Sequence, residues 1–286
     1  MMQQITEQAT SKQFLRDIAE NNYELPDTID NYAFAIALLA NLGSPDGELR
    51  DELSYMVLAS GIIDKGKLTP DQIENLLNMV LDNNHLFYHI GEVNTDSVFM
   101  RSFSNLVVAA ILYTDAREAT FSEPVIQRTK IALLRYAEEE KDWRGYVEGK
   151  GWAHAMAHLA DALDECAQAQ AMTQQDRQDI LQVVRRLAQL PEPLYHEEDM
   201  RLATTAQHII VGRQVDDIFL ESWLDACFVQ RGSDVTAWMS ATNVKNFLRS
   251  LYFLLQWDNM LPTVSMQISD ILKRLDDVYI QIADGR

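Results

Sequence analysis

Cysteine is scarce in this 286-residue sequence, which contains only Cys166 and Cys227. Two cysteines cannot form the disulfide framework that holds small secreted domains together. The N-terminal stretch MMQQITEQATSK also lacks the apolar core of a secretory signal. The longest apolar runs, such as 106–113, are much shorter than the roughly 18 residues that a membrane span requires. We therefore expect a cytoplasmic protein that has no membrane partner.

Glycine and proline are also few, at 11 and 7 residues, whereas hydrophobic residues make up 47% of the chain. This composition is typical of a globular protein rich in helices, because glycine and proline are the residues that most strongly interrupt a helix. No stretch of five or more residues alternates convincingly between apolar and polar side chains, as a half-buried strand would. The sequence therefore predicts an all-α fold.

Positive charge is the third thing the chain lacks, since 24 Lys and Arg face 43 Asp and Glu, for a net charge of −19. Nucleic acids and anionic membranes both select a basic surface, so we expect neither as the main partner. A local group of basic residues does precede residue 151, and it consists of Arg128, Lys130, Arg135, Lys141, Arg144 and Lys150. Acidic residues are interspersed with this group, which indicates a mixed, solvated surface.

The spacing of helix signals predicts how the helices are arranged. Apolar residues at helical spacing, proline breaks and caps such as the Thr69-Pro70-Asp71-Gln72 box divide the chain into about twelve helices with short connectors. Helices that pair every ~40–50 residues are typical of stacked antiparallel hairpins. We therefore predict a HEAT-like α-solenoid, with a globular α-bundle as the alternative. No connector has the length of a flexible linker, so one domain over 1–286 is expected.

The segment 143–168 carries the strongest candidate for a site. Three glycines within seven residues precede a predicted helix that holds His154, His158 and Asp161. At about 100° per residue, these three side chains share one face of the helix. Two imidazoles and a carboxylate on adjacent turns are typical ligands of zinc, iron or manganese. The zinc-protease pattern HExxH is absent, because Ala155 stands where its glutamate would lie.

Structural roles compete with this interpretation. Histidines on a helix also form hydrogen bonds to neighbouring helices or point into solvent, and short histidine spacings arise by chance. Apolar residues of the same helix predict its core face, and these are Trp152, Met156, Leu159, Leu163 and Cys166. Nucleotide-binding loops, GxSxG motifs and paired CxxC motifs are absent, so the sequence supports no NTPase, serine hydrolase or dinucleotide enzyme.

Polar stripes on three otherwise apolar helices predict where a ligand would bind. They belong to Arg101 with Asn105, to the two histidines, and to Arg201 with His208. If hairpins stack in register, these stripes share one concave surface, and the glycine-rich turn adds side chains at its rim. The helix N-terminus after this turn would also favour an anion. The predicted ligand-binding residues are Arg101, Arg144, Tyr146, Glu148, Lys150, Trp152, Arg201 and His208.

Three segments, DSVFMRSFSNLVVAAIL, RGYVEGKGWAHAMAHLADALDE and EEDMRLATTAQHII, resemble an uncharacterised bacterial domain family of unknown function. The stretch GKGWAHAMAHLAD is the most specific part of this resemblance. The resemblance implies a cytosolic, bacterial, helical protein, and it implies no activity, cofactor or catalytic residue.

We therefore expect a cytosolic α-helical binding or scaffold protein with a polar groove centred on Gly145–Glu165, and with an unidentified protein or small molecule as its partner. The alternative is a metal-dependent enzyme, a hydrolase, that uses His154, His158 and Asp161. The only cofactor this alternative requires is a divalent metal, and it leaves the catalytic residues unassigned.

Overall fold

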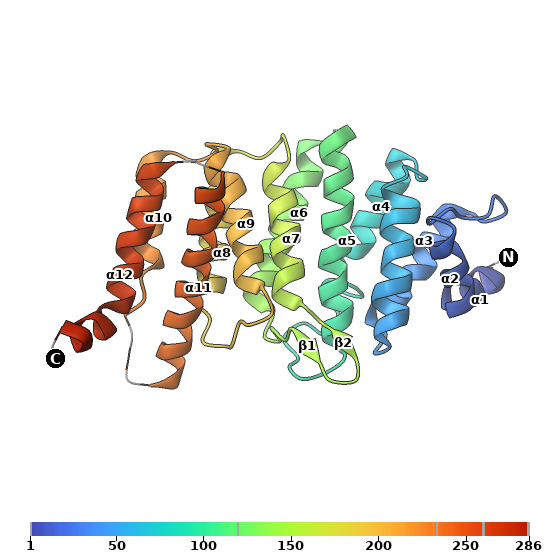
Figure 1. Ribbon diagram of the computed structural model, residues 1–286. Helices are drawn as coiled ribbons and strands as arrows, with labels where there is room; N and C mark the ends of the chain where they lie inside the picture. Colours follow the sequence, from blue (N-terminus) through green and yellow to red (C-terminus); the bar gives the residue numbers. More distant parts are fainter. Residues whose placement is uncertain (1, 119, 231, 233, 259–260, 285–286) are drawn as a thin grey trace. The chain divides into compact units, whose positions relative to one another are not determined.

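The protein is all-α, as predicted, and Figure 1 shows its computed structural model. The structure describes residues 2–118, 120–230, 232, 234–258 and 261–284, and it leaves out the side chains of 2, 118 and 277–284. Contacts within the chain divide it into two compact units, Met1–Ala171 and Met172–Arg286. The single domain expected from the sequence therefore stays a prediction, as does the stacking of the helices into a solenoid.

Unit 1 carries helices and one small hairpin. Its elements are α1 (Met2–Thr10), α2 (Lys12–Glu20), α3 (Asn31–Leu39), η1 (Ala40–Gly43), η2 (Glu48–Tyr55), η3 (Val57–Ile63), α4 (Pro70–Val80), α5 (Ser97–Glu118), α6 (Glu123–Glu139), β1 (Tyr146–Val147), β2 (Gly151–Trp152) and α7 (Ala155–Gln168). In η2 and η3 the backbone is π-helical. Helices α5 and α7 lie side by side, and α6 lies behind them (Figure 1).

The described residues of unit 2 form five helices and the loops that connect them. Its elements are α8 (Gln174–Ala188), α9 (Glu198–Val211), α10 (Asp217–Cys227), α11 (Val235–Trp257) and α12 (Pro262–Asp284). Helix α11 packs against both α9 and α12. The indole of Trp223 in α10 is buried and donates a hydrogen bond to the carbonyl of Leu181 in α8 at 2.7 Å.

Side chains at the helix starts explain several boundaries. The capping box predicted at Thr69 is confirmed: Gln72 N donates to Thr69 Oγ1 at 3.3 Å, and Thr69 N donates to Gln72 Oε1 at 3.0 Å. Thr173 and Asp176 form a second capping box before α8. Each box satisfies two backbone groups that a helix end would otherwise leave without a partner.

The contact between α5 and α7 forms the centre of unit 1. Five alanines of α7 are buried, and their small side chains let the backbones of α5 and α7 approach closely. They are Ala155, Ala157, Ala160, Ala162 and Ala167. Met156, Leu159, Leu163 and Cys166 are buried as the sequence predicts. The stretch Ser97–Arg117 is long and apolar enough to cross a membrane, but 72% of its most apolar window is buried inside the protein. Such burial is what a core helix requires.

The start of the histidine helix differs from the prediction. Helix α7 begins at Ala155, and Trp152 lies in strand β2 with 37% of its surface exposed, where the sequence predicted a core position. His154 is the N-cap and has a left-handed backbone, with φ of 48°. The cause is long-range, because the residues before His154 pair with residues 146–147 instead of continuing the helix.

Candidate functional site

The glycine-rich turn is a two-stranded antiparallel hairpin. Tyr146 lies opposite Trp152, and Val147 lies opposite Gly151. Lys150 N donates to the carbonyl of Val147 at 3.0 Å and closes the turn. Gly151 has a φ of +80°, a conformation that is open to glycine but costly for other residues. The unusual glycine content of this segment therefore has a structural cause.

The buried side chain of Arg50 binds the backbone of the hairpin. Its side chain is fully buried, and its Nη2 donates to the carbonyls of Lys150 at 3.0 Å and of Trp152 at 2.8 Å. Nη1 donates to the carbonyl of Ser44 at 2.6 Å, and the guanidinium lies over the rings of Phe99 and Phe103. Burial lowers the pKa of Arg50 to about 10, so it remains charged at neutral pH.

Gly47 allows the hairpin to pack closely against residues 47–50, because glycine has no side chain at this contact. A Cβ at residue 47 would be 3.0 Å from the carbonyl oxygen of Lys150 and 3.6 Å from the Cα of Gly151. Neither Gly47 nor Arg50 is among the residues predicted from the sequence. A basic residue between Leu49 and Asp51 resembles any residue of a solvated helix face, and nothing local in the sequence shows that its partners lie about a hundred residues further on.

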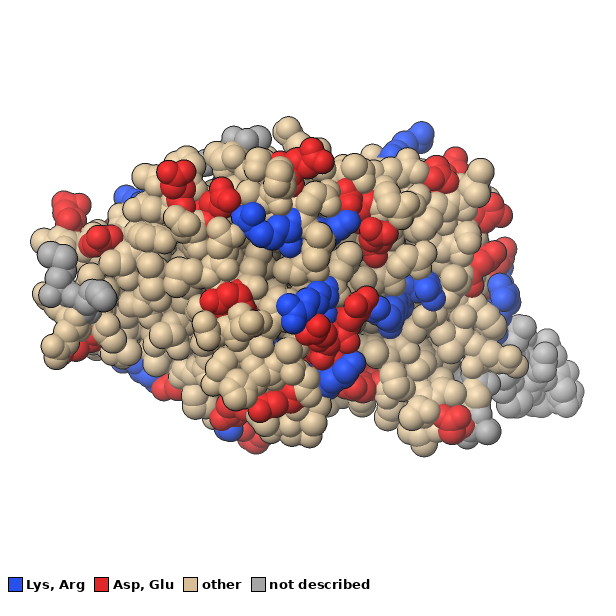
Figure 2. All heavy atoms as spheres, turned by 180° about the vertical axis from the view of Figure 1, so that it is seen from behind, with Lys and Arg blue, Asp and Glu red and all other residues tan. Residues whose placement is uncertain are grey.

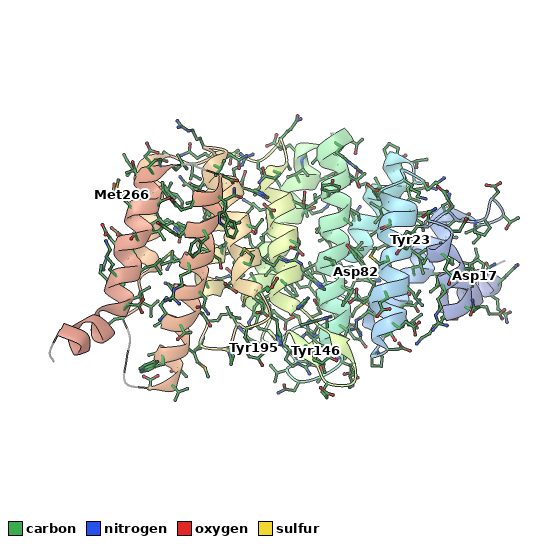
Figure 3. All side chains as sticks on the ribbon, viewed as in Figure 1. Asp17, Tyr23, Asp82, Tyr146, Tyr195 and Met266 are labelled. Atoms are coloured by element: carbon green, nitrogen blue, oxygen red, sulfur yellow. The ribbon has the colours of Figure 1, made fainter. Side chains whose placement is uncertain are left out.

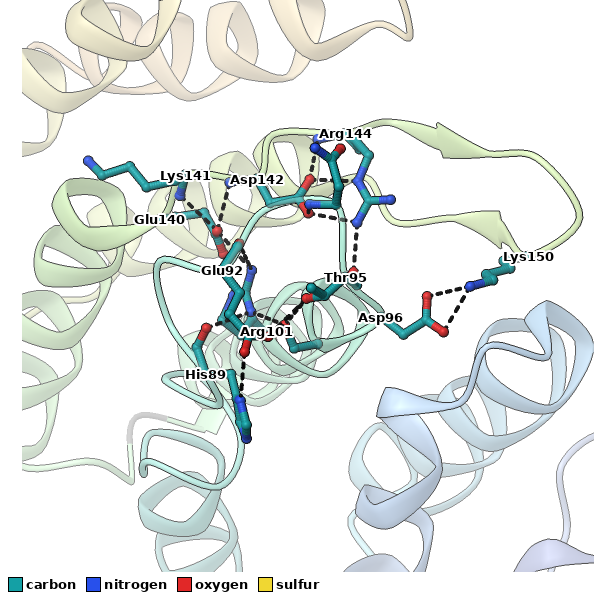
Figure 4. A network of polar contacts seen from close by, with 12 residues as sticks. His89, Glu92, Thr95, Asp96, Arg101, Glu140, Lys141, Asp142, Arg144 and Lys150 are labelled. Carbon is teal, nitrogen blue, oxygen red and sulfur yellow. Dashed lines mark hydrogen bonds and ion pairs between the residues drawn. The ribbon is translucent and has the colours of Figure 1, made fainter.

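Ion pairs attach the hairpin to the connector before α5 (Figure 4). Lys150 Nζ lies 2.6 Å and 2.8 Å from the two carboxylate oxygens of Asp96. Arg144 Nη2 donates to Asp142 at 2.6 Å and to the carbonyl of Thr95 at 2.7 Å. Arg144 and Lys150, which the sequence predicts as ligand-binding residues, thus have acidic partners within the fold.

Arg101 is a buried structural residue, although the sequence predicts a role in a ligand groove. Its Nε and Nη2 donate to Glu140 at 2.6 Å and 2.9 Å, and both side chains are fully buried. It also donates to the carbonyls of Tyr88, His89 and Glu92. Burial would lower the pKa of Arg101, but the hydrogen bonds and charge of Glu140 outweigh burial and raise it.

A series of aromatic rings leads from the surface hairpin into the core. The Tyr146 and Trp152 rings are 5.0 Å apart, edge to face, and Trp152 stacks on His154 at 4.1 Å. His154 and His158 are 5.7 Å apart, and His158 lies 4.9 Å from Phe103. The outer members, Tyr146 and Trp152, are 47% and 37% exposed. Figure 3 shows Tyr146 at the end of the helices that carries the hairpin.

The protonation of His158 can be assigned from its neighbours. Ser102 Oγ contacts both the carbonyl of Ala153 and His158 Nδ1, the latter at 2.8 Å. A carbonyl only accepts, so the Ser102 proton goes to Ala153, and Nδ1 of His158 must carry a proton that it donates to Ser102. Ser102 is therefore oriented as a structural hydroxyl, and this pair lacks the hydrogen-bond direction that activates a serine nucleophile.

The structure brings His154 and His158 together, with Asp161 one turn further along α7. Among the described residues, no group of three or more His, Cys, Asp or Glu side chains has an arrangement that could hold a metal ion. His85 and His89 contact carboxylates of their own connector, Asp82 at 2.8 Å and Glu92 at 3.0 Å. Zinc, iron or manganese binding by the three predicted ligands stays a prediction.

The remaining predicted residues have different surroundings. Glu148 is exposed at the tip of the hairpin. Arg201 and His208 are exposed on α9, which belongs to unit 2, whereas Arg101 and the two histidines belong to unit 1. Within unit 1, Arg101 is sealed in the core and His158 is only 7% exposed, so these two do not line an open groove.

Backbone carbonyls lie where the sequence suggested an anion. Ala153 N and His154 N both donate to the carbonyl of Gly145, at 2.7 Å and 3.0 Å, and Ala155 N donates to the carbonyl of Arg144 at 3.3 Å. The hairpin itself therefore satisfies the amides that lead into α7.

Charged residues around the site form a mixed surface, as the sequence predicts. Arg128 pairs with Glu74, and Arg135 pairs with Glu139. On the face drawn in Figure 2, Lys and Arg side chains lie among Asp and Glu side chains and do not form one continuous basic area.

Comparison with known proteins gives a family but no activity. Residues 86–253 match the model of a family described as protein of unknown function (DUF2785). This range includes most of the connector before α5, the hairpin and the histidine helix. Neither a curated protein nor a solved structure matches the chain.

Proposed function

Since the chain belongs to this family of unknown function, we propose from its geometry that it is a helical binding or scaffold protein whose partner contacts the hairpin 145–152. The observation that supports this proposal is the exposure of two large aromatic side chains, Tyr146 and Trp152, on a rigidly held hairpin. Exposed and immobilised tyrosine and tryptophan residues are typical of the positions that contribute most to binding energy.

The contacts that attach the hairpin to the rest of unit 1 do not involve its two exposed rings. Arg50 donates to two backbone carbonyls of the hairpin, and the half-exposed ion pair between Lys150 and Asp96 attaches the hairpin to the connector before α5. The rings of Tyr146 and Trp152 take no part in these two contacts; they pack against each other, and Trp152 also stacks on His154. Because these ring contacts already hold the two side chains, the protein loses less conformational entropy when a partner binds.

The partner class follows from charge and shape. The net charge of −19 disfavours nucleic acids and anionic membranes, so we propose a protein or a small molecule in the cytoplasm. Stacking of helical hairpins into a HEAT-like solenoid, which we propose for the helices within each unit, would place the hairpin beside an extended surface suited to holding such a partner.

The test compares three purified proteins as bait in extracts of cells that contain the protein naturally. We expect one partner to be retained by the wild type and lost with Tyr146→Ala/Trp152→Ala, at an unchanged melting temperature. Tyr113→Ala is the matched control, because Tyr113 is 51% exposed on α5 of the same unit. Equal recovery of every retained protein by wild type and double variant would contradict a binding role for the hairpin.

The second candidate is a metal-dependent enzyme, and the fixed tautomer of His158 favours it. Metal-binding histidines usually donate one ring N–H to a neighbour, as His158 does to Ser102, which directs the other nitrogen at the metal. Two imidazoles on one zinc ion have ring centres roughly 5 Å apart, given Zn–N distances of about 2.0–2.1 Å. The 5.7 Å separation of His154 and His158 is close to this value.

Elemental analysis of protein purified without a histidine tag separates the two candidates. Zinc, iron or manganese near one equivalent, lost in His154→Ala/His158→Ala and kept in His208→Ala, would support the metal enzyme. Less than about a tenth of an equivalent in all three proteins would exclude a tightly bound metal and leave the binding role.

A further inference from the structure

Unit 2 contains a groove that the proposed function does not use. It lies between the segment after α8, which includes Pro193 and Tyr195, and the first turns of α11, from Asp234 to Asn246. Its volume is about 640 Å³. This volume is within the range of about 300–1,000 Å³ that is typical of ligand sites in proteins.

Large apolar side chains line this groove and are open to solvent. Tyr195 is 72% exposed, Val235 is 68% exposed and Trp238 is 41% exposed. Figure 3 labels Tyr195 in its segment. Folding would bury such side chains if they served only the core, so a contiguous exposed set of them marks an interaction surface.

The groove is fixed by hydrogen bonds beneath it. Asn243 in α11 is buried, and its side-chain amide donates to the carbonyls of Leu190 at 2.8 Å and Glu192 at 2.6 Å. These bonds tie the segment after α8 to α11, and Leu194 is buried between them. The two walls of the groove therefore keep their spacing without an occupant.

The length of the groove fits a short extended peptide. Twelve residues separate Asp234 from Asn246, which corresponds to about 18 Å along a helix at 1.5 Å per residue. A polyproline II segment rises about 3.1 Å per residue, so roughly six residues span the groove. The described walls are a helix and a loop with no strand edge, so a peptide cannot bind by adding a strand to a sheet.

The charge around the groove selects a basic occupant. Asp234 lines its end, and the described lining residues include no lysine or arginine. Glu192 is exposed in the segment that carries the Tyr195 wall, whereas Glu198 is buried and accepts a hydrogen bond from His196 N. An arginine or lysine beside the prolines of a ligand would therefore meet the carboxylate of Asp234, with no competing cation among the described lining residues.

We propose that this groove binds a proline-containing peptide segment with a basic residue at one end, in the polyproline II conformation. The rings of Tyr195 and Trp238 pack against the prolines, as aromatic grooves do in other proline-recognising domains. Asp234 contacts the basic end. The preformed extended conformation of such a peptide reduces the entropy that it loses on binding.

The experiment measures fluorescence anisotropy of two fluorescein-labelled peptides, Arg-Pro-Leu-Pro-Pro-Leu-Pro and its reversed sequence, titrated with the full chain. Either direction of a polyproline II helix can fit such a groove, which is why both are used. We expect saturable binding of at least one peptide, with a dissociation constant on the order of 10–100 μM, and no binding of versions in which alanine replaces every proline.

Variants locate the binding. Trp238→Ala and Tyr195→Ala should each weaken it about tenfold. Asp234→Asn keeps the helix cap, since asparagine caps as well as aspartate, and should weaken binding about threefold while reducing its dependence on salt. Trp257→Ala is the matched control, because Trp257 is 67% exposed on the same helix outside the groove. Its affinity should equal that of the wild type.

Three results would overturn the proposal. One is the absence of saturable binding by both peptides up to about 1 mM. Another is equal loss of affinity in Trp238→Ala and Trp257→Ala, which would place the peptide elsewhere. The third is binding of tetramethylammonium at the Trp238 ring without peptide binding, which would assign the groove to small cations.

Discussion

At the scale of single residues, the two arginines that hold unit 1 together, Arg50 and Arg101, show why burial decides the role of a charged side chain. Each is fully buried and donates to several backbone carbonyls. A planar guanidinium spreads five N–H donors over three nitrogens, whereas a lysine has three donors on one nitrogen and cannot reach acceptors that lie as far apart. Arg50 therefore anchors the hairpin, and Arg101 anchors the connector before α5 to the end of α6.

The first prediction concerns Arg50→Lys. A lysine keeps the charge but cannot reach the carbonyl of Ser44 and those of Lys150 and Trp152 together, so buried acceptors lose their donor. We expect a loss of about 2–3 kcal/mol in the free energy of unfolding, measured with urea. Arg135→Lys, at a side chain that is 50% exposed, should change it by less than ~0.5 kcal/mol. Equal effects would show that the buried contacts contribute little.

The second prediction concerns Gly47→Ala. Gly47 has right-handed helical dihedrals, so alanine would ordinarily stabilise the protein by ~0.4–1 kcal/mol. Here its Cβ would approach the Lys150 carbonyl to 3.0 Å, and we expect the sign to reverse. The urea midpoint should fall, and amide exchange in the hairpin should accelerate.

Gly149→Ala provides the comparison for Gly47. Gly149 has a φ of +72°, and no atom lies within 4 Å of the position that an added methyl group would take, so only its backbone conformation opposes alanine. We expect it to cost ~1–2 kcal/mol without displacing the hairpin. A rise in stability for Gly47→Ala would contradict the close seating of the hairpin.

At the scale of elements, local signals predict helix boundaries well. Thr69 caps its helix as predicted, because a cap depends on residues within one turn. The start of α7 was missed for the opposite reason. Strand β2 forms only by pairing with β1, and the anchor beneath both strands comes from Arg50, about a hundred residues earlier. Periodicity in one segment contains no information about such a partner.

Only part of the candidate site could be predicted, because its other residues depend on partners that are distant in the sequence. The sequence identifies the segment with three glycines and the two histidines, and the structure places the histidine rings together. Ser102 and Glu140, which orient His158 and Arg101, carry no local signal. Their roles depend on the packing of α5 against α7 and on the end of α6, which only the tertiary structure defines.

The third prediction concerns the junction of α5 and α6. In Glu140→Gln, the buried Arg101 loses its counter-charge, and we expect a loss of about 3–5 kcal/mol in the free energy of unfolding. Glu139→Gln is the neighbouring control, and it should cost less than ~0.5 kcal/mol because its pair with Arg135 is exposed. Calorimetry or urea unfolding measures both. Similar losses in the two variants would exclude a special role for the buried pair.

At the scale of the whole molecule, acidity dominates the electrostatics. The chain carries 43 acidic and 24 basic residues, so carboxylates outside ion pairs repel one another near neutral pH. Other carboxylates are stabilised in the ionised form. Hydrogen bonds from His89, Ser97 and Thr95 lower the pKa of Glu92 to about 2, and hydrogen bonds from Lys12 lower the pKa values of Asp46 and Glu48.

These two groups of carboxylates predict a maximum in stability under mildly acidic conditions. From pH 7 towards the isoelectric point near 4.6, net negative charge falls, and the melting temperature should rise or stay level. For Glu92, Asp46 and Glu48 the folded pKa lies below the unfolded value. Their contribution is therefore present above about pH 4.5 and is lost as pH falls towards 2. We expect a steep fall in melting temperature over that range, measured by circular dichroism.

Salt at about 0.5 M should flatten the change between pH 7 and 5, because it screens the repulsion. A melting temperature that falls steadily from pH 7 downward would contradict this balance.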